Sequence, residues 1–507
     1  MTRPSRSRRR RFATALACGL LLVGCSAGAG DSAAASSTLR YAAVGTPATA
    51  TNDPHGGFAN ESDLVRFALT YDALTVPGED GETRPRLATS WTPDASLTRW
   101  TIQLRDDAAF ADGRPVRAAD VLYSLRRVDA KAAENFGRMA VFDLDASRVT
   151  GAHALELVTV KPYAVVGQAL EGATFVVPEG SDDFSSPVPG SGPFRQVDGD
   201  PGAALLERNE EWWGPAPPVE RIEVRAVPDP QARADAVLSG QADLAGGVAP
   251  ATARQADESG SAELITRPAG VMYPFVMRLD TAPFDDPRVR SAVRLAADRQ
   301  VLLDTVFLGY GQLGNDLITP RDPSSPGGLP QRTRDLERAR GLLVEAGYPD
   351  GVDVTLHTTT SYPGMEAAAT VFAEQLAAIG MRARVEVAPP DTYFVDVFAQ
   401  EPFYVGFFGG IPFLDVARVS LAADSPTNET AWRRPDWEAA LDAALATADE
   451  GQRRAQLGEL QRVLRDEGGY VVWAVGDDLK LAAPGVSGVP TGPGFNAVFL
   501  DQVRLER

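Results

Sequence analysis

Cysteine and histidine are scarce in this sequence. Its 507 residues include two cysteines, Cys18 and Cys25, and three histidines, His55, His153 and His357. Disulfide frameworks and zinc clusters both depend on these side chains, so neither has enough of them here. We therefore expect no metal site, no cofactor and no disulfide scaffold.

Positive charge is also in short supply. Lys and Arg number 49 against 68 Asp and Glu, a formal net charge of -19. A surface of this sign repels phosphate backbones, which excludes nucleic acid as an expected partner.

Hydrophobic residues make up 44% of the chain, enough to bury a large core. The length suggests about three structural units.

The first residues have the layout of an export signal. Six arginines within residues 3–11 precede an apolar run from Phe12 to Val23. This run of 12 residues is too short for a membrane-spanning helix, which needs roughly 20. Its end, Leu21-Leu22-Val23-Gly24-Cys25, resembles the lipobox of bacterial lipoproteins. We expect residues 1–24 to be a lipoprotein signal peptide; the alternative is an ordinary secretory leader with an incidental cysteine.

A tether and an acidic body are expected after the leader. Lipidation at Cys25 would add two or more acyl chains, enough for stable anchoring to a membrane. Residues 26–37 are nearly all Ser, Ala and Gly, a composition typical of a flexible linker. The folded body is therefore expected to start at Thr38.

Strand and helix patterns alternate along this body. Residues 352–356 alternate like a strand, 366–379 have helical spacing closed by Gly380, and 384–387 form a second strand pattern. This βαβ unit indicates an α/β fold. A ligand crevice is then expected beyond the strand carboxyl ends or between two lobes.

A series of short motifs gives a more specific indication. In chain order they are Leu87-Ala88-Thr89-Ser90-Trp91, Trp100-Thr101-Ile102-Gln103-Leu104-Arg105, Phe110-Ala111-Asp112-Gly113, Gly190-Ser191-Gly192-Pro193-Phe194, Arg208-Asn209-Glu210-Glu211-Trp212-Trp213, Ser239-Gly240-Gln241-Ala242-Asp243, Pro283-Phe284-Asp285-Asp286-Pro287 and Ala346-Gly347-Tyr348-Pro349. This series resembles the solute-binding lipoproteins of bacterial ATP-binding-cassette (ABC) importers, family five, which includes dipeptide-, oligopeptide- and nickel-binding receptors. The resemblance extends over most of the mature chain.

The resemblance implies a two-lobed α/β fold of the periplasmic-binding-protein type (type II), with an extra subdomain in the first lobe. We expect the first lobe at 38–270, completed by 476–507, with its extra subdomain at about 53–185. The second lobe is expected at 271–475. Residues 273–278 and 470–474 resemble the strands that cross between the lobes.

The resemblance also points to ligand-binding residues. Peptide receptors of the family present an aromatic residue on a second-lobe loop and, three positions later, an aspartate for the ligand's amino terminus. Phe408 and Ile411 occupy these positions here, so that aspartate is missing. Asp415 is either a substitute or a solvated loop residue. Gly409 and Gly410 belong to the same apolar, backbone-lined wall, which suits stacking or main-chain hydrogen bonds.

Three further residues lie where related receptors contact their ligands. Phe58 and Asn60 follow the loop after the first strand, and Trp473 lies on the return segment. A tryptophan in an apolar run is also typical of a core, so both interpretations of Trp473 remain open.

A secreted hydrolase is the main alternative class. The sequence has no Gly-x-Ser-x-Gly elbow, no His-Glu-x-x-His and no phosphate-binding loop. Paired carboxylates such as Asp106-Asp107 fall at turn positions. We therefore expect a protein that is not an enzyme.

The sequence thus predicts an extracytoplasmic substrate-binding lipoprotein of an ABC transporter, anchored to the outer face of the cytoplasmic membrane. It would capture a small solute, by resemblance a peptide, between two lobes and deliver it to the membrane permease. The alternative solutes are a metal chelate, an oligosaccharide, a siderophore or a signal molecule. Because the chain has only three histidines, bare nickel is not an expected solute.

Overall fold

The computed structural model describes residues 38–506 except 57–59, 132–138, 172–173 and 391. Internal contacts divide the chain into Met1–Ser36 and Ser37–Arg507, and the described residues belong to the second unit. The predicted signal peptide, Cys25, the tether and Phe58 lie outside the described residues. None of the described helices combines the length and the apolar character that a bilayer crossing requires.

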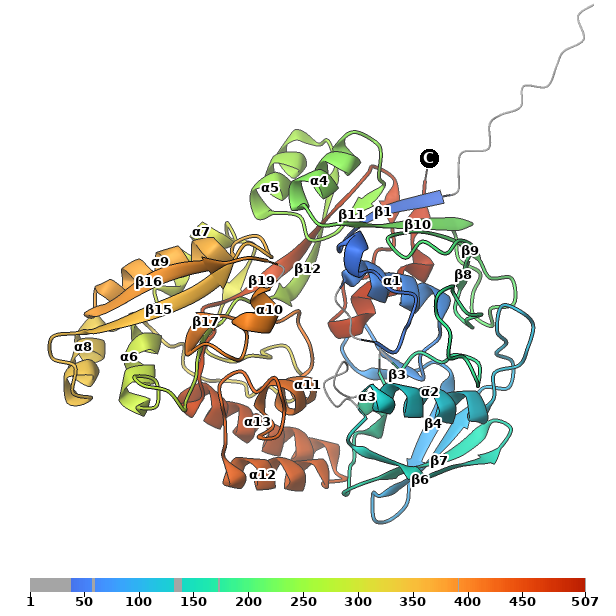
Figure 1. Ribbon diagram of the computed structural model, residues 1–507, viewed down its shortest axis with the longest axis horizontal. Coiled ribbons are helices and arrows are strands. Elements are labelled where there is room, and N and C mark those ends of the chain that lie inside the picture. Colours follow the sequence, from blue (N-terminus) through green and yellow to red (C-terminus); the bar gives the residue numbers. More distant parts are fainter. Residues whose placement is uncertain (1–37, 57–59, 132–138, 172–173, 391, 507) are drawn as a thin grey trace, which may run out of the picture. The chain divides into compact units, whose positions relative to one another are not determined.

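The largest sheet joins the beginning and the end of the folded body (Figure 1). Its eight strands run in the order β12-β19-β11-β1-β10-β9-β8, with β14 paired to β19. β1 is parallel to β10 and β11, whereas β19 is antiparallel to β11 and β12. Helices α1, α4 and α5 lie against these strands. The elements are β1 (Thr38–Val44), β8 (Phe194–Gln196), β9 (Ala203–Arg208), β10 (Arg221–Val227), β11 (Leu244–Ala245), β12 (Glu263–Val271), β14 (Gly311–Leu313), β19 (Ala474–Ala482), α1 (Glu61–Thr70), α4 (Pro230–Leu238) and α5 (Pro250–Ser259).

A four-stranded antiparallel sheet, β4-β5-β7-β6, forms the extra subdomain together with α2. Its separate hydrophobic core is drawn from residues between Leu74 and Val176. The hairpin β2-β3 and the short helix α3 lie beside it. The elements are β2 (Thr75–Pro77), β3 (Thr83–Pro85), β4 (Ala88–Pro93), β5 (Arg99–Leu104), β6 (Phe142–Gly151), β7 (Ala154–Thr159), α2 (Ala118–Ala130) and α3 (Val166–Ala169).

The third sheet has five strands in the order β16-β15-β17-β13-β18. β15 and β16 are parallel and α9 connects them, which confirms the predicted βαβ unit. The elements are β13 (Phe275–Met277), β15 (Val352–Thr359), β16 (Met381–Ala388), β17 (Phe403–Val405), β18 (Tyr470–Val471), α6 (Pro287–Ala296), α7 (Arg299–Val306), α8 (Leu336–Glu345), α9 (Met365–Ala377), α12 (Pro435–Leu445) and α13 (Glu450–Glu467).

Two lobes result, as predicted. We call the eight-stranded and four-stranded sheets with their helices the first lobe, and the five-stranded sheet with its helices the second lobe. The chain crosses from β12 to β13 and returns from β18 to β19, so the crossing segments lie near 272–274 and 472–473. The residue limits of the lobes stay a prediction, because β14 lies within 271–475 and yet pairs with β19.

Short elements complete the fold. They are η1 (Pro47–Thr49), α10 (Tyr393–Asp396), α11 (Phe413–Val416), the π-helical turn η2 (Ala417–Leu421), β20 (Val486–Ser487), η3 (Gly494–Val498), η4 (Leu500–Gln502) and β21 (Arg504–Leu505). Val486, Val498, Leu500 and Val503 pack into the core beneath β1 and α1. The C-terminal segment therefore completes the first lobe.

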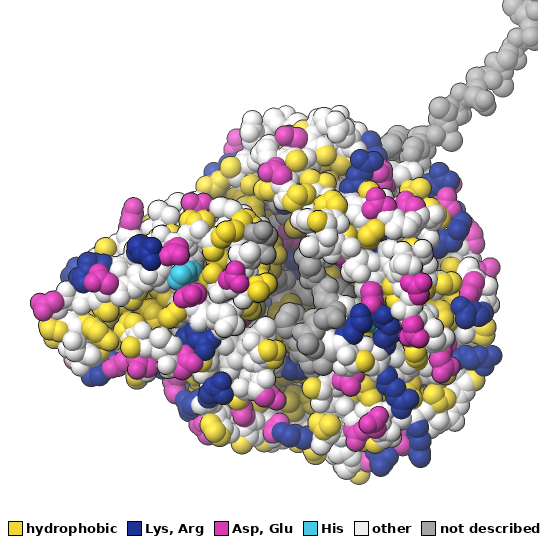
Figure 2. Space-filling view, viewed as in Figure 1, with side chains coloured by type: hydrophobic (Ala, Val, Ile, Leu, Met, Phe, Trp, Pro, Cys, Tyr) yellow, Lys and Arg dark blue, Asp and Glu magenta, His cyan; other side chains and the backbone are white. Residues whose placement is uncertain are grey.

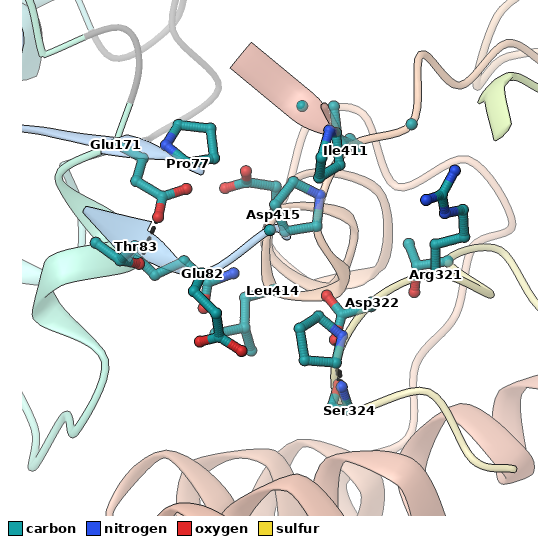
Figure 3. A pocket seen from close by; sticks show the side chains of 18 of the residues that line it. Pro77, Glu82, Thr83, Glu171, Arg321, Asp322, Ser324, Ile411, Leu414 and Asp415 are labelled. Carbon is teal, nitrogen blue, oxygen red and sulfur yellow. Dashed lines mark hydrogen bonds between the residues drawn. The ribbon is translucent and has the colours of Figure 1, made fainter. Parts of the chain in front are cut away.

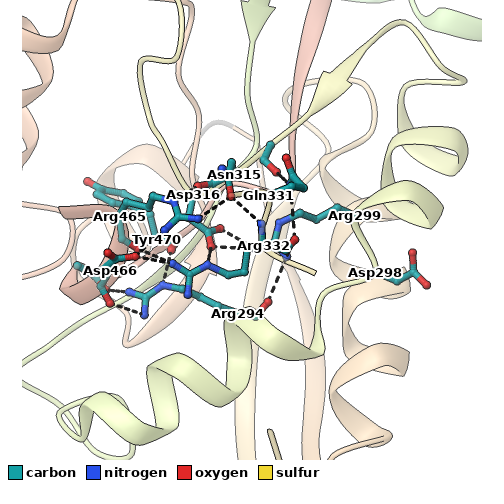
Figure 4. Close-up of polar contacts among 12 residues, drawn as sticks. Arg294, Asp298, Arg299, Asn315, Asp316, Gln331, Arg332, Arg465, Asp466 and Tyr470 are labelled. Atoms are coloured by element: carbon teal, nitrogen blue, oxygen red, sulfur yellow. Dashed lines mark hydrogen bonds and ion pairs between the residues drawn. The ribbon is translucent and has the colours of Figure 1, made fainter. Parts of the chain in front are cut away.

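A network of arginines and aspartates, buried at Asp316 and Arg299, ties the second lobe together (Figure 4). The fully buried carboxylate of Asp316 accepts two hydrogen bonds of 2.9 Å from Arg299 and lies 2.7 Å from Nε of Arg332. Arg332 and Arg465 both pair with Asp466 on α13, at 2.8 and 2.7 Å. Asp316 thus compensates the buried Arg299, and it shares the partly buried Arg332 with Asp466.

The second lobe also buries the carboxyl group of one glutamate, Glu429. Glu429 is 1% exposed, and burial raises its pKa to about 8. Between pH 4.5, its ordinary pKa, and about 8, the folded state therefore holds a proton that the unfolded chain releases. We expect the free energy of unfolding to fall as pH rises through this window and then to level off. Urea unfolding at several pH values checks this; a Glu429→Gln variant with the same pH slope as the parent would contradict it.

Candidate functional site: a cavity between the lobes

A cavity of about 320 Å³ lies where the two lobes meet. The first lobe contributes the β2-β3 turn, the segment around α3, and residues 493–495. The second lobe contributes loop 318–324, loop 410–415 and the first turns of α13. Figure 2 shows the viewed face of the molecule hollowed between the lobes. A solute in this cavity would contact both lobes at once.

Direct contacts join the lobes beside the cavity. Glu82 on the β2-β3 turn pairs with Arg454 on α13 at 2.8 Å. Lys161 pairs with Asp442 on α12 at 2.6 Å, and the backbone N–H of Ala164 donates to the carbonyl of Leu445 at 2.7 Å. All three contacts are made between the extra-subdomain side of the first lobe and helices α12 and α13.

Loop 410–415 is held in place from both ends. The backbone of Phe408 exchanges two hydrogen bonds with Met272, of 2.9 and 3.0 Å, on the crossing segment. Gly410 has φ of +73°, and a Cβ there would come within 2.9 Å of the carbonyl oxygen of Ala269, so glycine suits this close approach. The N–H of Phe413 donates to the Asp322 carboxylate at 2.8 Å. The loop thus presents Ile411 and Asp415 to the cavity.

The structure brings some of the predicted ligand-binding residues together and separates others. Gly410, Ile411 and Asp415 line the cavity, whereas Gly409 is partly exposed beside it. Phe408 and Trp473 are 4% and 0% exposed and lie in the second-lobe core. Neither of these aromatics lines the cavity, and ligand contact by them stays a prediction.

Asn60 has a structural environment. It is 5% exposed and precedes the first turn of α1. Its side chain accepts from the N–H of Thr46 at 2.9 Å and donates to Asp63 at 3.1 Å. These bonds fix the loop after β1, and Asn60 is not among the residues that line the cavity.

The first-lobe wall was missed by sequence reasoning. Two of its polar groups, Thr83 and Glu171, are 88 positions apart in the chain and are joined by a hydrogen bond from the Thr83 hydroxyl to the Glu171 carboxyl. No local motif marks either residue. Their pairing arises from the parallel bridge between Thr75 and Glu171, which brings α3 against the β2-β3 hairpin.

The carboxyl groups around the cavity differ in their partners (Figure 3). Asp415 pairs with Arg418 at 2.7 Å, and Asp322 accepts from the N–H groups of Ser324 and Phe413, each at 2.8 Å. Glu171 is 8% exposed, and burial raises its pKa to about 8. Glu171 therefore holds a proton at neutral pH.

Metal ligands do not gather in the described part of the chain: no three His, Cys, Asp or Glu side chains there lie close enough to hold an ion.

These features define a two-lobed binding protein with a solute-sized cavity at the lobe interface. The model of the bacterial extracellular solute-binding proteins, family 5, matches residues 82–420. The chain belongs to this family, and its function is that of a solute-binding protein of an ABC importer, acting outside the cytoplasm.

Individual relatives show which solutes the family handles elsewhere. The chain is 25% identical over 502 residues to the nickel-binding periplasmic protein of Escherichia coli, covering 89% of this chain and 92% of that one. It is 26% identical over 454 residues to the glutathione-binding protein GsiB of Salmonella paratyphi A, covering 85% and 87%. Both relatives are binding proteins.

A solved structure confirms the fold. The periplasmic binding protein DppA from Helicobacter pylori, in complex with the peptide STSA, superposes with a TM-score of 0.79 at 21% identity. The match covers 93% of this chain and 98% of that one.

Proposed function

We propose that this protein captures a small peptide in the cavity between its lobes, closes around it, and releases it chemically unaltered to a membrane permease. The cavity carries this proposal, because its lining comes from both lobes. A ligand that contacts both lobes binds the closed form more tightly than the open form, and this difference in affinity drives closure. The glutathione-binding relative and the peptide complex of DppA support a peptide as the solute.

The proposal is tested by identifying the solute. Protein purified without unfolding is analysed by native mass spectrometry, and the released solute is sequenced or fragmented. We expect a peptide in stoichiometric amount. Small-angle scattering with and without that peptide should show a smaller radius of gyration when it is bound. A peptide recovered cleaved, or identical scattering profiles, would contradict the proposal.

The ion pair between Lys161 and Asp442 is expected to favour the closed form. Both side chains are more than 40% exposed, and such pairs contribute roughly 0.2–1 kcal/mol. Lys161→Gln should therefore weaken solute binding by at most about fivefold, through a faster dissociation rate. Arg148→Gln is the control, since Arg148 lies in the same subdomain and pairs with Glu156 of that subdomain. Equal dissociation rates in the parent and Lys161→Gln proteins would count against a role in closure.

We also propose that Cys25 carries a lipid anchor on the outer face of the cytoplasmic membrane. The support is the lipobox-like sequence that ends at Cys25. Cys25→Ala is expected to move the protein from the membrane fraction to the soluble fraction, because the acyl chains that hold it would be absent. Cell fractionation with immunoblotting measures this. A variant that stays with the membrane would show that something else holds the chain there.

A further inference from the structure

We propose that Glu171 recognises a positively charged group of the solute, an ammonium or a guanidinium, from the first-lobe wall of the cavity. This inference rests on the proposed function and names a chemical feature that the solute must have. The resemblance led us to look for such a carboxyl at the position of Ile411, on the second lobe. Glu171 lies on the first lobe, across the cavity from Ile411.

The first argument is that Glu171 is a buried acid without a compensating cation. It is 8% exposed and lines the cavity. The Thr83 hydroxyl donates to its Oε1. Among the described side chains, no Lys, Arg or His forms an ion pair with it, whereas Glu82 and Asp415 each have an arginine partner. A buried carboxyl without a neighbouring cation is costly to ionise, and an incoming cation lowers that cost.

The second argument is the position of Asp415. Figure 3 shows the carboxyl groups of Glu171 and Asp415 directed toward one another from opposite walls. The negative charge of Asp415 contributes to the raised pKa of Glu171, as does that of Glu82. A cation between Glu171 and Asp415 would meet negative charge from both lobes. Such a cation favours the closed form, in which both carboxyls can reach it.

The arginines that line the cavity are engaged elsewhere. Arg454 pairs with Glu82 and Glu450, Arg453 donates to the carbonyls of Thr447 and Ala448, and Arg321 donates to the carbonyl of Pro268 at 2.9 Å. The groups that act on Glu171 are thus Thr83 and Glu82 from the hairpin and Asp415 from α11. A cationic solute would make Glu171 release its proton, which couples binding to pH.

The test compares probes that differ in charge. Isothermal titration calorimetry is run on the mature chain with agmatine, spermidine, trialanine, N-acetyl-trialanine and maltotriose. We expect at least one cationic probe to bind, and N-acetyl-trialanine to bind at least about tenfold more weakly than trialanine if the peptide is the better probe. The Glu171→Gln side chain can still accept a hydrogen bond from Thr83. This variant should bind the cationic probe about tenfold or more weakly than the parent does. Glu210→Gln, an exposed site outside the cavity, is the matched control and should bind like the parent.

A pH series gives a second readout. The guanidinium of agmatine remains charged between pH 6.5 and 8.5, so agmatine is the probe for this series and the titration of Glu171 dominates any change in its affinity. For the parent we expect affinity for the cationic probe to rise about tenfold across this range, and Glu171→Gln should abolish the rise. Thermal melts of both variants confirm that the fold is intact.

The outcomes separate this inference from the proposed function. Equal affinities of the parent and Glu171→Gln for a cationic probe would overturn the role of Glu171. Failure of every cationic probe would overturn it as well. If maltotriose or another uncharged solute then binds and closes the lobes, solute capture stands while cation recognition falls. If no solute at all produces closure, the proposed function itself fails.

Discussion

Asp316→Ala is expected to lower the free energy of unfolding by about 3–5 kcal/mol, the largest effect we anticipate for a single polar residue. The Asp316 carboxylate is fully buried and neutralises both Arg299 and Arg332. Its removal leaves the buried guanidinium of Arg299 without a carboxylate, and it leaves Arg332 with only the half-exposed Asp466. Breaking a buried pair costs far more than breaking an exposed one, because the remaining charge stays desolvated.

Urea unfolding followed by circular dichroism measures this effect. Asp353→Ala is the matched control, since its ion pair with Arg382 is exposed and should contribute at most about 1 kcal/mol. Asp316 has φ of 59°, a conformation that asparagine also tolerates, so Asp316→Asn isolates the loss of charge from backbone strain. If Asp316→Ala costs no more than Asp353→Ala, the network does not stabilise the second lobe as we infer.

Trp473→Ala is expected to cost about 3–5 kcal/mol of folding stability. Trp473 is fully buried, its ring stacks on Phe307 with 5.2 Å between centroids, and its Nε1 donates to the carbonyl of Tyr273 at 2.6 Å. Truncation would leave a large cavity and an unpaired carbonyl beside the crossing segment. Trp473→Phe keeps a ring and should cost less, about 1–3 kcal/mol, chiefly for the lost hydrogen bond.

Stability and solute affinity must be measured separately for these variants. Phe394→Ala is the control for an aromatic truncation. Phe394 is 40% exposed, so its truncation should lower the free energy of unfolding only slightly. If Trp473→Ala remains as stable as the parent while it loses solute binding, Trp473 is a ligand residue and our assignment to the core is wrong. Loss of stability with affinity retained in the folded fraction is the result that we expect.

Local structure followed closely from local sequence. The strand patterns at 352–356 and 384–387 and the helical spacing of 366–379 correspond to β15, β16 and α9 of the structure. Asp335 caps α8 by accepting from the N–H of Arg338, and Gly380 has the positive φ that a helix end favours. These features depend on neighbours within a few positions, so the chain itself specifies them.

The order of motifs was informative beyond local structure. It indicated the two-lobed fold and the solute-binding family, which the family model and the solved structure confirm. The order of the motifs indicates the fold because each motif occupies a turn, a helix cap or a core position in it. It does not report which of those positions face a ligand, since ligand specificity resides in a few side chains.

The sequence by itself determined the helices and strands, their caps, the family and the acidic character of the chain. Only the tertiary structure decided the composition of the cavity. It placed Trp473 and Phe408 in the core, and it brought Glu82 to Arg454 across 372 positions of the chain. It also placed Glu171 opposite Asp415. Periodicity and capping act over a few residues, whereas a cavity wall depends on how separate sheets pack, and no local pattern encodes that.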